Sequence, residues 1–178
     1  MNDHDALELL RAAIPSAAGE TWADLGAGSG GFTRALATLV GTGGRVIAVD
    51  RDARGLAAIR AWSARWRDGG EIVTMQADVA RLPELPPLDG VVIANVLHFV
   101  ADAEAALRGV AARLRPRGQL VLIEYEGRQP SPWVPYPVSA ARFAELAAAS
   151  GFTPPRVVAT RPSAYGGELY VAAAERPG

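Results

Sequence analysis

The chain has no cysteine and no lysine, and its 178 residues include only two histidines, His4 and His98. Without cysteine it can form no disulfide, no thiolate zinc site and no cysteine nucleophile. Without lysine it can form no Schiff base. So few nitrogen and sulfur ligands predict that it holds no metal. All 18 basic residues are arginines, and with 19 acidic residues they leave a net charge of −1. This balance indicates no nucleic-acid partner.

Long hydrophobic runs are also missing, so no segment predicts a membrane span or a membrane partner. Residues 1–5 are acidic and lack the layout of a signal peptide, and we therefore expect a cytoplasmic protein. Hydrophobic residues make up 49% of the chain, enough for a sizeable core. We expect one domain over 1–178, with an N-terminal helix and lead-in over 1–18 and the core over 19–175.

What the chain does contain is a regular alternation of strand and helix patterns. Near-continuous apolar runs, typical of strands covered on both faces, alternate with segments of helical spacing. We expect helices over 5–14, 30–40, 52–67, 101–114 and 139–150, a turn over 115–118, and strands over 21–25, 45–50, 72–76, 90–95, 119–124, 156–161 and 168–174. The alternation predicts an α/β fold: a doubly wound, mostly parallel sheet between two layers of helices. A short turn joins the last two strands, which must therefore run antiparallel.

The most informative segment joins the first strand to the helix that follows, and it reads Asp24-Leu25-Gly26-Ala27-Gly28-Ser29-Gly30-Gly31. Glycines let backbone N–H groups approach a ligand, and a helix N-terminus favours an anion. The glycine spacing, with Asp50 about 20 residues on, also fits a dinucleotide site. However, the carboxylate of Asp24 would repel a pyrophosphate and attract an ammonium. The segment therefore favours S-adenosylmethionine, which carries an amino acid in place of phosphates.

With these features the chain resembles the class I S-adenosylmethionine-dependent methyltransferases, in particular small members with a type 11 or type 25 methyltransferase domain. Their seven-stranded sheet also ends in a reversed strand. The resemblance covers about 19–175 and rests on the order of five segments, Asp24-Leu25-Gly26-Ala27-Gly28-Ser29-Gly30, Val49-Asp50, Gln76-Ala77-Asp78-Val79, Ile93-Ala94-Asn95-Val96-Leu97-His98 and Leu114-Arg115-Pro116-Arg117-Gly118-Gln119. It implies S-adenosylmethionine as cofactor and S-adenosylhomocysteine as product.

The resemblance also implies a set of cofactor contacts at the carboxyl ends of the strands, the edge where open α/β sheets bind ligands. Asp50 would accept both ribose hydroxyls, and Asp78 would accept from the adenine amino group. Asn95 would contact the methionine amine. The implied cofactor-binding residues are Asp24, Gly26, Ala27, Gly28, Gly30, Asp50, Arg51, Asp78, Val79 and Asn95.

Two of these acids have a plainer interpretation, because Asp is a favoured helix N-cap. Asp24 could cap the turn that follows it, and Asp50 could cap the helix expected over 52–67. The glycine run and the matched spacing together favour cofactor roles for Asp50 and Asp78.

His98 is the candidate catalytic residue. Methyl transfer is an in-line displacement that positioning promotes, and it needs a general base only when the nucleophile arrives protonated. His98 follows the fourth strand, and an imidazole can act as a base near neutral pH. The same residue could instead simply pack or hydrogen-bond the backbone.

Candidate substrate contacts come from two loops at the same edge of the sheet, the proline-rich loop 127–137 and the turn between the last two strands. They are Trp133, Tyr136, Arg161 and Tyr165. Aromatic side chains on stiff loops suit the walls of a small-molecule pocket. The proline-rich loop fits a lid or a partner surface equally well, and the roles of Glu124 and Glu168 stay open.

Three functions remain. The leading hypothesis is methyl transfer to an O, N or C atom of a small-molecule acceptor by a monomer or homodimer. The sequence lacks the Pro-Pro-aromatic run of methyltransferases that modify exocyclic amines of bases, and the cysteine of the C5-pyrimidine enzymes. The alternatives are a nucleotide-binding oxidoreductase or isomerase of the dinucleotide fold, and a noncatalytic S-adenosylmethionine-binding partner module.

Overall fold

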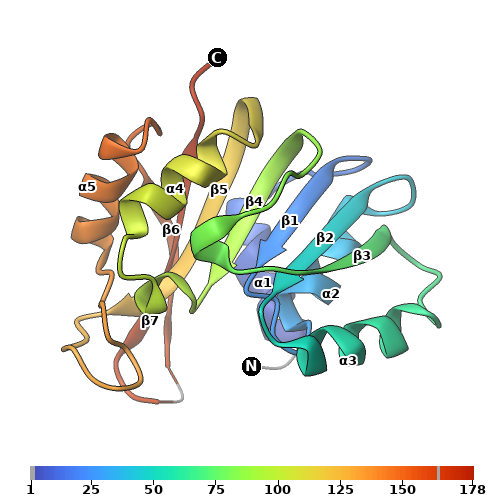
Figure 1. The fold of residues 1–178 in the computed structure, drawn as a ribbon, viewed down its shortest axis with the longest axis horizontal. Coiled ribbons are helices and arrows are strands. Elements are labelled where there is room, and N and C mark those ends of the chain that lie inside the picture. The colour runs from blue at the N-terminus through green and yellow to red at the C-terminus, as the bar shows by residue number, and fades with distance from the viewer. Residues whose placement is uncertain (1–2, 164) are drawn as a thin grey trace.

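Seven strands form one sheet, in the order β3-β2-β1-β4-β5-β7-β6. The computed structural model describes residues 3–163 and 165–178. The strands are β1 (Thr21–Leu25), β2 (Arg45–Asp50), β3 (Glu71–Gln76), β4 (Leu88–Ala94), β5 (Leu114–Glu126), β6 (Arg156–Pro162) and β7 (Glu168–Glu175). β1 to β5 pair in parallel, whereas β7 lies antiparallel between β5 and β6 (Figure 1). The prediction of a mostly parallel sheet with a reversed last strand is confirmed.

Helices cover both faces of this sheet. They are α1 (Asp3–Ala13), α2 (Gly31–Val40), α3 (Ala53–Ser63), α4 (Ala103–Ala111) and α5 (Ala140–Ala149), with the short 3₁₀ helices η1 (Val79–Arg81) and η2 (Leu97–Phe99). In Figure 1, α4 and α5 lie in front of the sheet, and α1 and α2 lie behind it. None of the described helices is long and apolar enough to cross a membrane.

The core divides into layers because successive strand residues face opposite sides of the sheet. On β2, Val46 packs in the cluster of α1 and α2, whereas Ile47 and Val49 pack in the cluster of α4 and α5. Ala48 faces α3, where it contacts a small cluster with Leu56 and Ile59. β1, β2 and β4 are therefore buried on both faces, as their apolar runs indicate, whereas the edge strand β3 is only partly covered.

Two predicted boundaries are wrong. Residues 115–118 form no separate turn, because Leu114 already pairs with Leu88 and β5 continues through a register shift to Gln119. The preceding helix accordingly ends at Ala111 rather than at 114. The predicted helix over 52–67 ends at Ser63, where the backbone tightens into bonds such as that from Trp66 N–H to the Ser63 carbonyl.

Candidate active site

The glycine turn between β1 and α2 has the backbone geometry that its sequence predicts. Gly26, Gly28 and Gly30 all have positive φ, at 85°, 53° and 91°. A Cβ on Gly26 would lie 2.2 Å from Cγ2 of Val96, whereas a Cβ on Gly28 would meet nothing within 4 Å. Gly26 is thus required for the close approach of two loops. Gly28 keeps open the space in front of the turn.

Asp50 ties this turn to β2. Its Oδ2 accepts a hydrogen bond from the Gly28 N–H at 2.7 Å, and its Oδ1 accepts one from the Asp52 N–H at 2.8 Å. A carboxylate offers about four acceptor sites, so each oxygen keeps one for a ligand such as a diol. Asp52, whose Oδ1 accepts from the Arg54 N–H, caps α3. The interpretation of Asp50 as the helix cap is therefore wrong.

Asp24 lies beneath the turn rather than in front of it. Its side chain is 1% exposed, and its Oδ2 accepts a 2.6 Å hydrogen bond from Oγ1 of Thr33 in the first turn of α2. Burial raises the pKa of Asp24 to about 6; the hydrogen bond from Thr33 opposes this shift, and the charge of Asp50 adds to it. Asp24 therefore fastens α2 to the end of β1, and any effect on a ligand acts through the turn above it.

A first cavity, which we call the glycine-turn cavity, opens at the carboxyl ends of the parallel strands. Its volume is about 280 Å³, and Asp78 lies on its wall with its Oδ1 accepting from the Ala80 N–H at the start of η1. The structure brings together here many of the residues predicted to bind a cofactor. The lining residues are Gly26, Asp50, Arg51, Ala77, Asp78, Val79, Ala80, Asn95, Val96, Phe99, Val100 and Ala101.

A second and larger cavity, of about 780 Å³, lies beside the first, and we call it the aromatic cavity. The segment after β4, the end of β5, the loop 127–137 and the β6–β7 turn form its walls. The lining residues are Asn95, His98, Phe99, Tyr125, Arg128, Gln129, Pro130, Ser131, Trp133, Val134 and Tyr165. Asn95 and Phe99 line both cavities. A ligand in either cavity would therefore contact a wall of the other.

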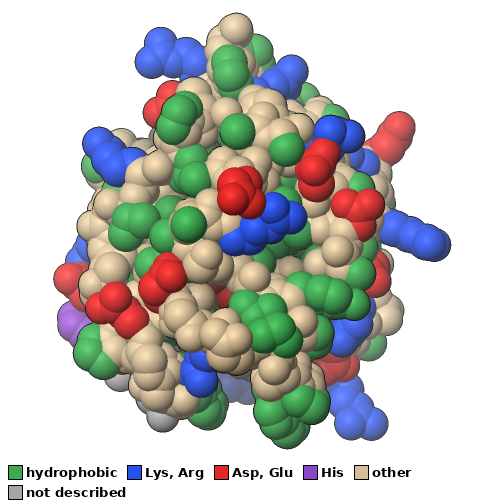
Figure 2. Space-filling model, turned by 90° about the vertical axis from the view of Figure 1, so that its left-hand side faces the viewer, with side chains coloured by type: hydrophobic (Ala, Val, Ile, Leu, Met, Phe, Trp, Pro, Cys, Tyr) green, Lys and Arg blue, Asp and Glu red, His purple; other side chains and the backbone are tan. Residues whose placement is uncertain are grey.

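The predicted substrate contacts divide into two groups. Trp133 and Tyr165 line the aromatic cavity, and each is 81% exposed. Tyr136 is exposed and does not line the cavity; its backbone N–H donates to the His98 carbonyl. Arg161 donates to Oδ2 of Asp5 on α1 at 2.7 Å and does not line the cavity. Figure 2 shows hydrophobic side chains at the lower end of the molecule, where these loops lie in Figure 1.

His98 and Glu124 form a buried pair in the wall of the aromatic cavity. Nδ1 of His98 lies 2.7 Å from Oε2 of Glu124, and their side chains are 3% and 1% exposed. Oε1 of Glu124 accepts from the backbone N–H of His98 at 3.2 Å. A carboxylate beside Nδ1 holds the proton on that nitrogen. Nε2 has no hydrogen-bond partner among the described residues and can accept a proton.

Sequence reasoning left the role of Glu124 open and missed Arg128 and Phe99. One signal for Glu124 was available: a charged residue that directly follows the apolar run Leu120–Ile123 at a strand's carboxyl end is buried at a cost unless it has a partner. No comparable signal marks Arg128 or Phe99.

Asn95 carries two further irregularities at the junction of the two cavities. Its φ is 55°, which is uncommon for a residue with a side chain, and its Oδ1 is buried without a hydrogen-bond partner. Such strain and an orphaned acceptor are found mainly at functional sites. This oxygen is thus the one buried side-chain acceptor at the junction of the cavities that no described residue satisfies, and a donor group of a ligand, such as an ammonium, would complete it.

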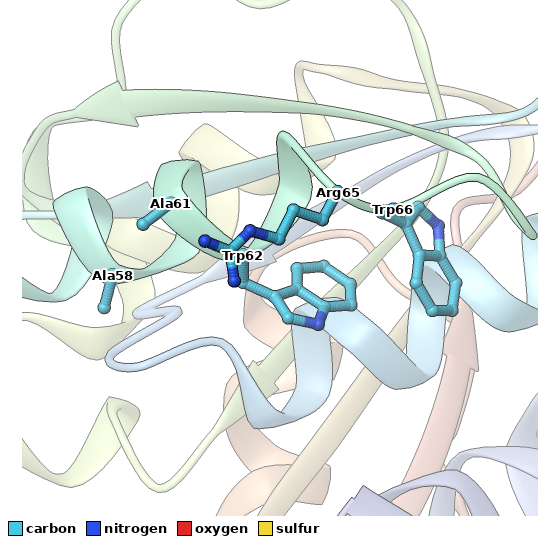
Figure 3. A pocket seen from close by; sticks show the side chains of 5 residues that line it. All are labelled: Ala58, Ala61, Trp62, Arg65 and Trp66. Carbon is cyan, nitrogen blue, oxygen red and sulfur yellow. The ribbon is translucent and has the colours of Figure 1, made fainter.

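A separate hollow of about 490 Å³ lies along the outside of α3 (Figure 3). Its walls are Ala58, Ala61, Trp62, Arg65 and Trp66. The two indole rings lie 4.8 Å apart, and the Arg34 guanidinium lies 5.4 Å from the Trp62 ring centre. None of the residues predicted for a site lies in this hollow, and the contacts of its two tryptophans with each other and with Arg34 are those of packed side chains.

Comparison with known proteins decides the family. Residues 23–122, which carry the glycine turn, Asp50, Asp78, Asn95 and His98, match the model of the methyltransferase domain. The chain belongs to this methyltransferase family. The resemblance inferred from the sequence is confirmed, and with it S-adenosylmethionine as the cofactor.

Relatives of this methyltransferase include enzymes of quinone biosynthesis. It is 34% identical over 114 residues to a 2-phytyl-1,4-naphtoquinone methyltransferase of Thermosynechococcus vestitus. This match covers 64% of the chain and 49% of that protein. It is 35% identical over 104 residues to a ubiquinone/menaquinone biosynthesis C-methyltransferase of Pseudomonas savastanoi pv. phaseolicola. This match covers 57% of the chain and 40% of that protein. The matches thus span less than half of either relative.

A solved structure shares the fold over almost the whole methyltransferase. It is the 1,6-didemethyltoxoflavin-N1-methyltransferase of Burkholderia thailandensis with bound 1,6-didemethyltoxoflavin and S-adenosylhomocysteine. The TM-score is 0.79 at 24% identity, and the match covers 99% of this chain and 78% of that one.

The residues of the glycine-turn cavity fit S-adenosylmethionine. Asp50 keeps acceptor sites for a ribose, Gly28 leaves open the space that a side chain would fill, and Asn95 presents an unpartnered acceptor. Together these supply the acceptors and the space that the cofactor's ribose and amino acid require.

Proposed function

We propose that this methyltransferase transfers a methyl group to a small aromatic acceptor bound in the aromatic cavity. The observation that carries the proposal is the position of Asn95 and Phe99, which line both cavities. An acceptor in the larger cavity would lie next to a cofactor in the smaller one. Such juxtaposition supplies most of what an in-line displacement needs.

The walls of the larger cavity support an aromatic acceptor. Phe99, Tyr125, Trp133 and Tyr165 offer ring faces, and aromatic rings attract one another in offset or edge-to-face contacts. The volume of about 780 Å³ falls within the range of ordinary small-molecule sites. The two relatives named for quinone methylation support a ring acceptor, and the name of the second supports carbon as the atom methylated.

S-adenosylmethionine, when bound, supplies a methyl group activated by its positively charged sulfur. The chain's own residues then have three tasks. Asp50 and Asp78 hold the nucleoside, the glycine turn receives the amino-acid end, and His98 takes a proton from the acceptor. Nε2 of His98 is the accepting atom, because Glu124 occupies Nδ1. Glu124 positions the imidazole and stabilises it once it is charged, as carboxylates do beside catalytic histidines.

Two measurements test this function. Calorimetric titration with S-adenosylmethionine, S-adenosylhomocysteine, NAD and NADP should show binding of the sulfur nucleosides alone; binding of the dinucleotides would favour the oxidoreductase alternative. A methyl-label transfer assay against phenols, naphthols, anilines and carbon acids should then show turnover of at least one ring acceptor. Cofactor binding with no turnover of any of them would favour a noncatalytic module. A small-molecule acceptor, a cytoplasmic location and a monomer or homodimer stay predictions.

A further inference from the structure

Among the described residues that line the aromatic cavity, Arg128 is the only one with a permanent charge. It follows the end of β5, and the other residues that line the cavity are apolar, aromatic or neutral polar, apart from the titratable His98. Because the wall is largely apolar, water there screens a charge less than it does on an open surface. An anionic group in contact with the guanidinium would therefore be attracted more strongly than it would be on an open surface.

The guanidinium of Arg128 is fixed in place by neutral groups. Its Nη2 donates to the carbonyls of Tyr165 and Gly166 at 2.7 and 2.6 Å, and its Cζ lies 4.9 Å from the Tyr125 ring centre. These contacts join the loop after β5 to the β6–β7 turn. They hold the fork of the side chain without neutralising it.

No described carboxylate is paired with this charge. None of the ion pairs among the described residues includes Arg128, and its Nε has no hydrogen-bond partner. Glu124 is committed to His98, and Glu126 accepts from the Ala140 N–H. Burial and the charge of Glu124 raise the pKa of the Tyr125 phenol, so that ring stays neutral. Among the described residues, Arg128 thus has no carboxylate in direct contact, although Glu124 adds negative charge nearby.

We propose that Arg128 is the specificity-determining residue of the acceptor site, and that the acceptor is an aromatic ring bearing an acidic oxygen, a carboxylate or a phenolate, which the guanidinium binds. The guanidinium attracts such oxygens through its charge and through Nη1, for which no bond to a described residue is found, and its flat face suits an aromatic stack. The inference rests on the proposed function, because it describes the substrate of the same cavity. It adds what the aromatic walls do not supply, namely the charge and orientation of the ring.

The test uses three probes of nearly the same shape, 2-naphthoate, 2-naphthol and the neutral 2-naphthamide. Each is titrated calorimetrically into the full chain with and without S-adenosylhomocysteine. The wild type should bind 2-naphthoate about tenfold or more tightly than 2-naphthamide. A phenolate-specific site would instead bind 2-naphthol tightly only above the pKa of its hydroxyl.

Arg128→Gln should remove this preference for the charged probe and leave the affinity for 2-naphthamide unchanged. Arg128→Lys should retain part of it, since lysine keeps the charge but not the fork. The control is Arg142→Gln, because Arg142 lies exposed on α5, paired with Glu145 and outside the cavity. It should change neither affinity.

Two results would overturn the inference. One is equal binding of the charged and neutral probes by the wild type. The other is an equal loss of both in Arg128→Gln, which would make Arg128 only a link between two loops. Failure of the proposed function would look different: no sulfur nucleoside would bind, or no acceptor would be methylated, whatever Arg128 does to the naphthoate affinity.

Discussion

Nδ1 of His98 lies 2.7 Å from Oε2 of Glu124, near the end of β5, the strand beside the central strand β4. The other oxygen of the same carboxylate accepts from the backbone N–H of His98. Glu124 therefore fixes both the imidazole ring and the backbone of His98. The side chain that emerges into the aromatic cavity has one orientation and one free nitrogen.

If His98 is the general base, His98→Ala should lower kcat by about 10²- to 10⁴-fold for an acceptor that must lose a proton. Affinity for S-adenosylhomocysteine should stay the same. His4→Ala is the matched control, since His4 is the other histidine and lies exposed on α1. Single-turnover methyl transfer measures the effect. If His98→Ala kept full activity across the pH range, the role of His98 would be structural only.

Glu124→Gln should reduce kcat less than His98→Ala does, because an amide still fills the space but no longer stabilises a charged imidazole. The pH dependence of kcat should move as well, and the double variant should be no slower than His98→Ala, as expected for residues that act as a unit. If the reductions in kcat of the two single variants added up in the double variant, His98 and Glu124 would act independently.

Replacing Asp50 should weaken cofactor binding more than it weakens the fold. Asp50→Asn replaces a carboxylate that accepts from Gly28 and Asp52 N–H groups, and we expect affinity for S-adenosylhomocysteine to fall at least tenfold, about the contribution of a charged hydrogen bond. Asp52→Asn, at the cap of α3, should change this affinity little. Calorimetry reads affinity and urea unfolding reads stability. Equal affinities in the two variants would contradict the ribose assignment.

Two glycines should respond differently to the same substitution. Gly26→Ala places a Cβ against Val96 and should impair folding, whereas the Cβ of Gly28→Ala enters open space. Gly28→Ala should cost only about 1–2 kcal/mol for its positive φ, yet reduce cofactor affinity because the methyl group occupies the ligand's approach. Thermal unfolding and calorimetry separate the two effects. Undiminished cofactor affinity in Gly28→Ala would place the ligand elsewhere.

Asp24 should make the fold less stable as pH rises. Its pKa, ordinarily 3.8, is raised to about 6 by burial, so between these values the folded state holds a proton that the unfolded state has released. Stability from this group is complete below about pH 4 and is lost as pH rises through about 6, a difference on the order of 3 kcal/mol. Asp24→Asn removes this titration. Urea unfolding of both proteins from pH 4 to 7 measures it, and parallel curves would contradict it.

The sequence predicted the parts of the site that local chemistry determines. Asp50 and Asp78 follow apolar strands, and the parallel topology alone brings such strand ends to one edge. Glycine at positions 26 and 28 permits the positive φ that both residues adopt. The predictions that depended on long-range contacts were less complete: nothing near Arg161 in sequence indicates its partner, Asp5, because α1 lies 156 positions earlier in the chain.

The pairing of β5 explains the largest error in the fold. A Pro and a Gly within 115–118 indicate a turn by local propensity, but Leu114 is drawn into the ladder by Leu88. The place of Arg128 in the cavity wall could not be predicted for the same reason, because its hydrogen-bond partners Tyr165 and Gly166 belong to another loop.

Asn95 and Phe99, common to both cavities, have a thermodynamic consequence for the order in which ligands bind. A molecule seated in one cavity fixes side chains that the other must use, so the two occupancies are linked by a coupling free energy. Such coupling is reciprocal: the factor by which the nucleoside changes the acceptor's dissociation constant is the factor by which the acceptor changes that of the nucleoside. We therefore expect that S-adenosylhomocysteine changes the affinity for an acceptor, and that the acceptor changes the affinity for S-adenosylhomocysteine by the same factor.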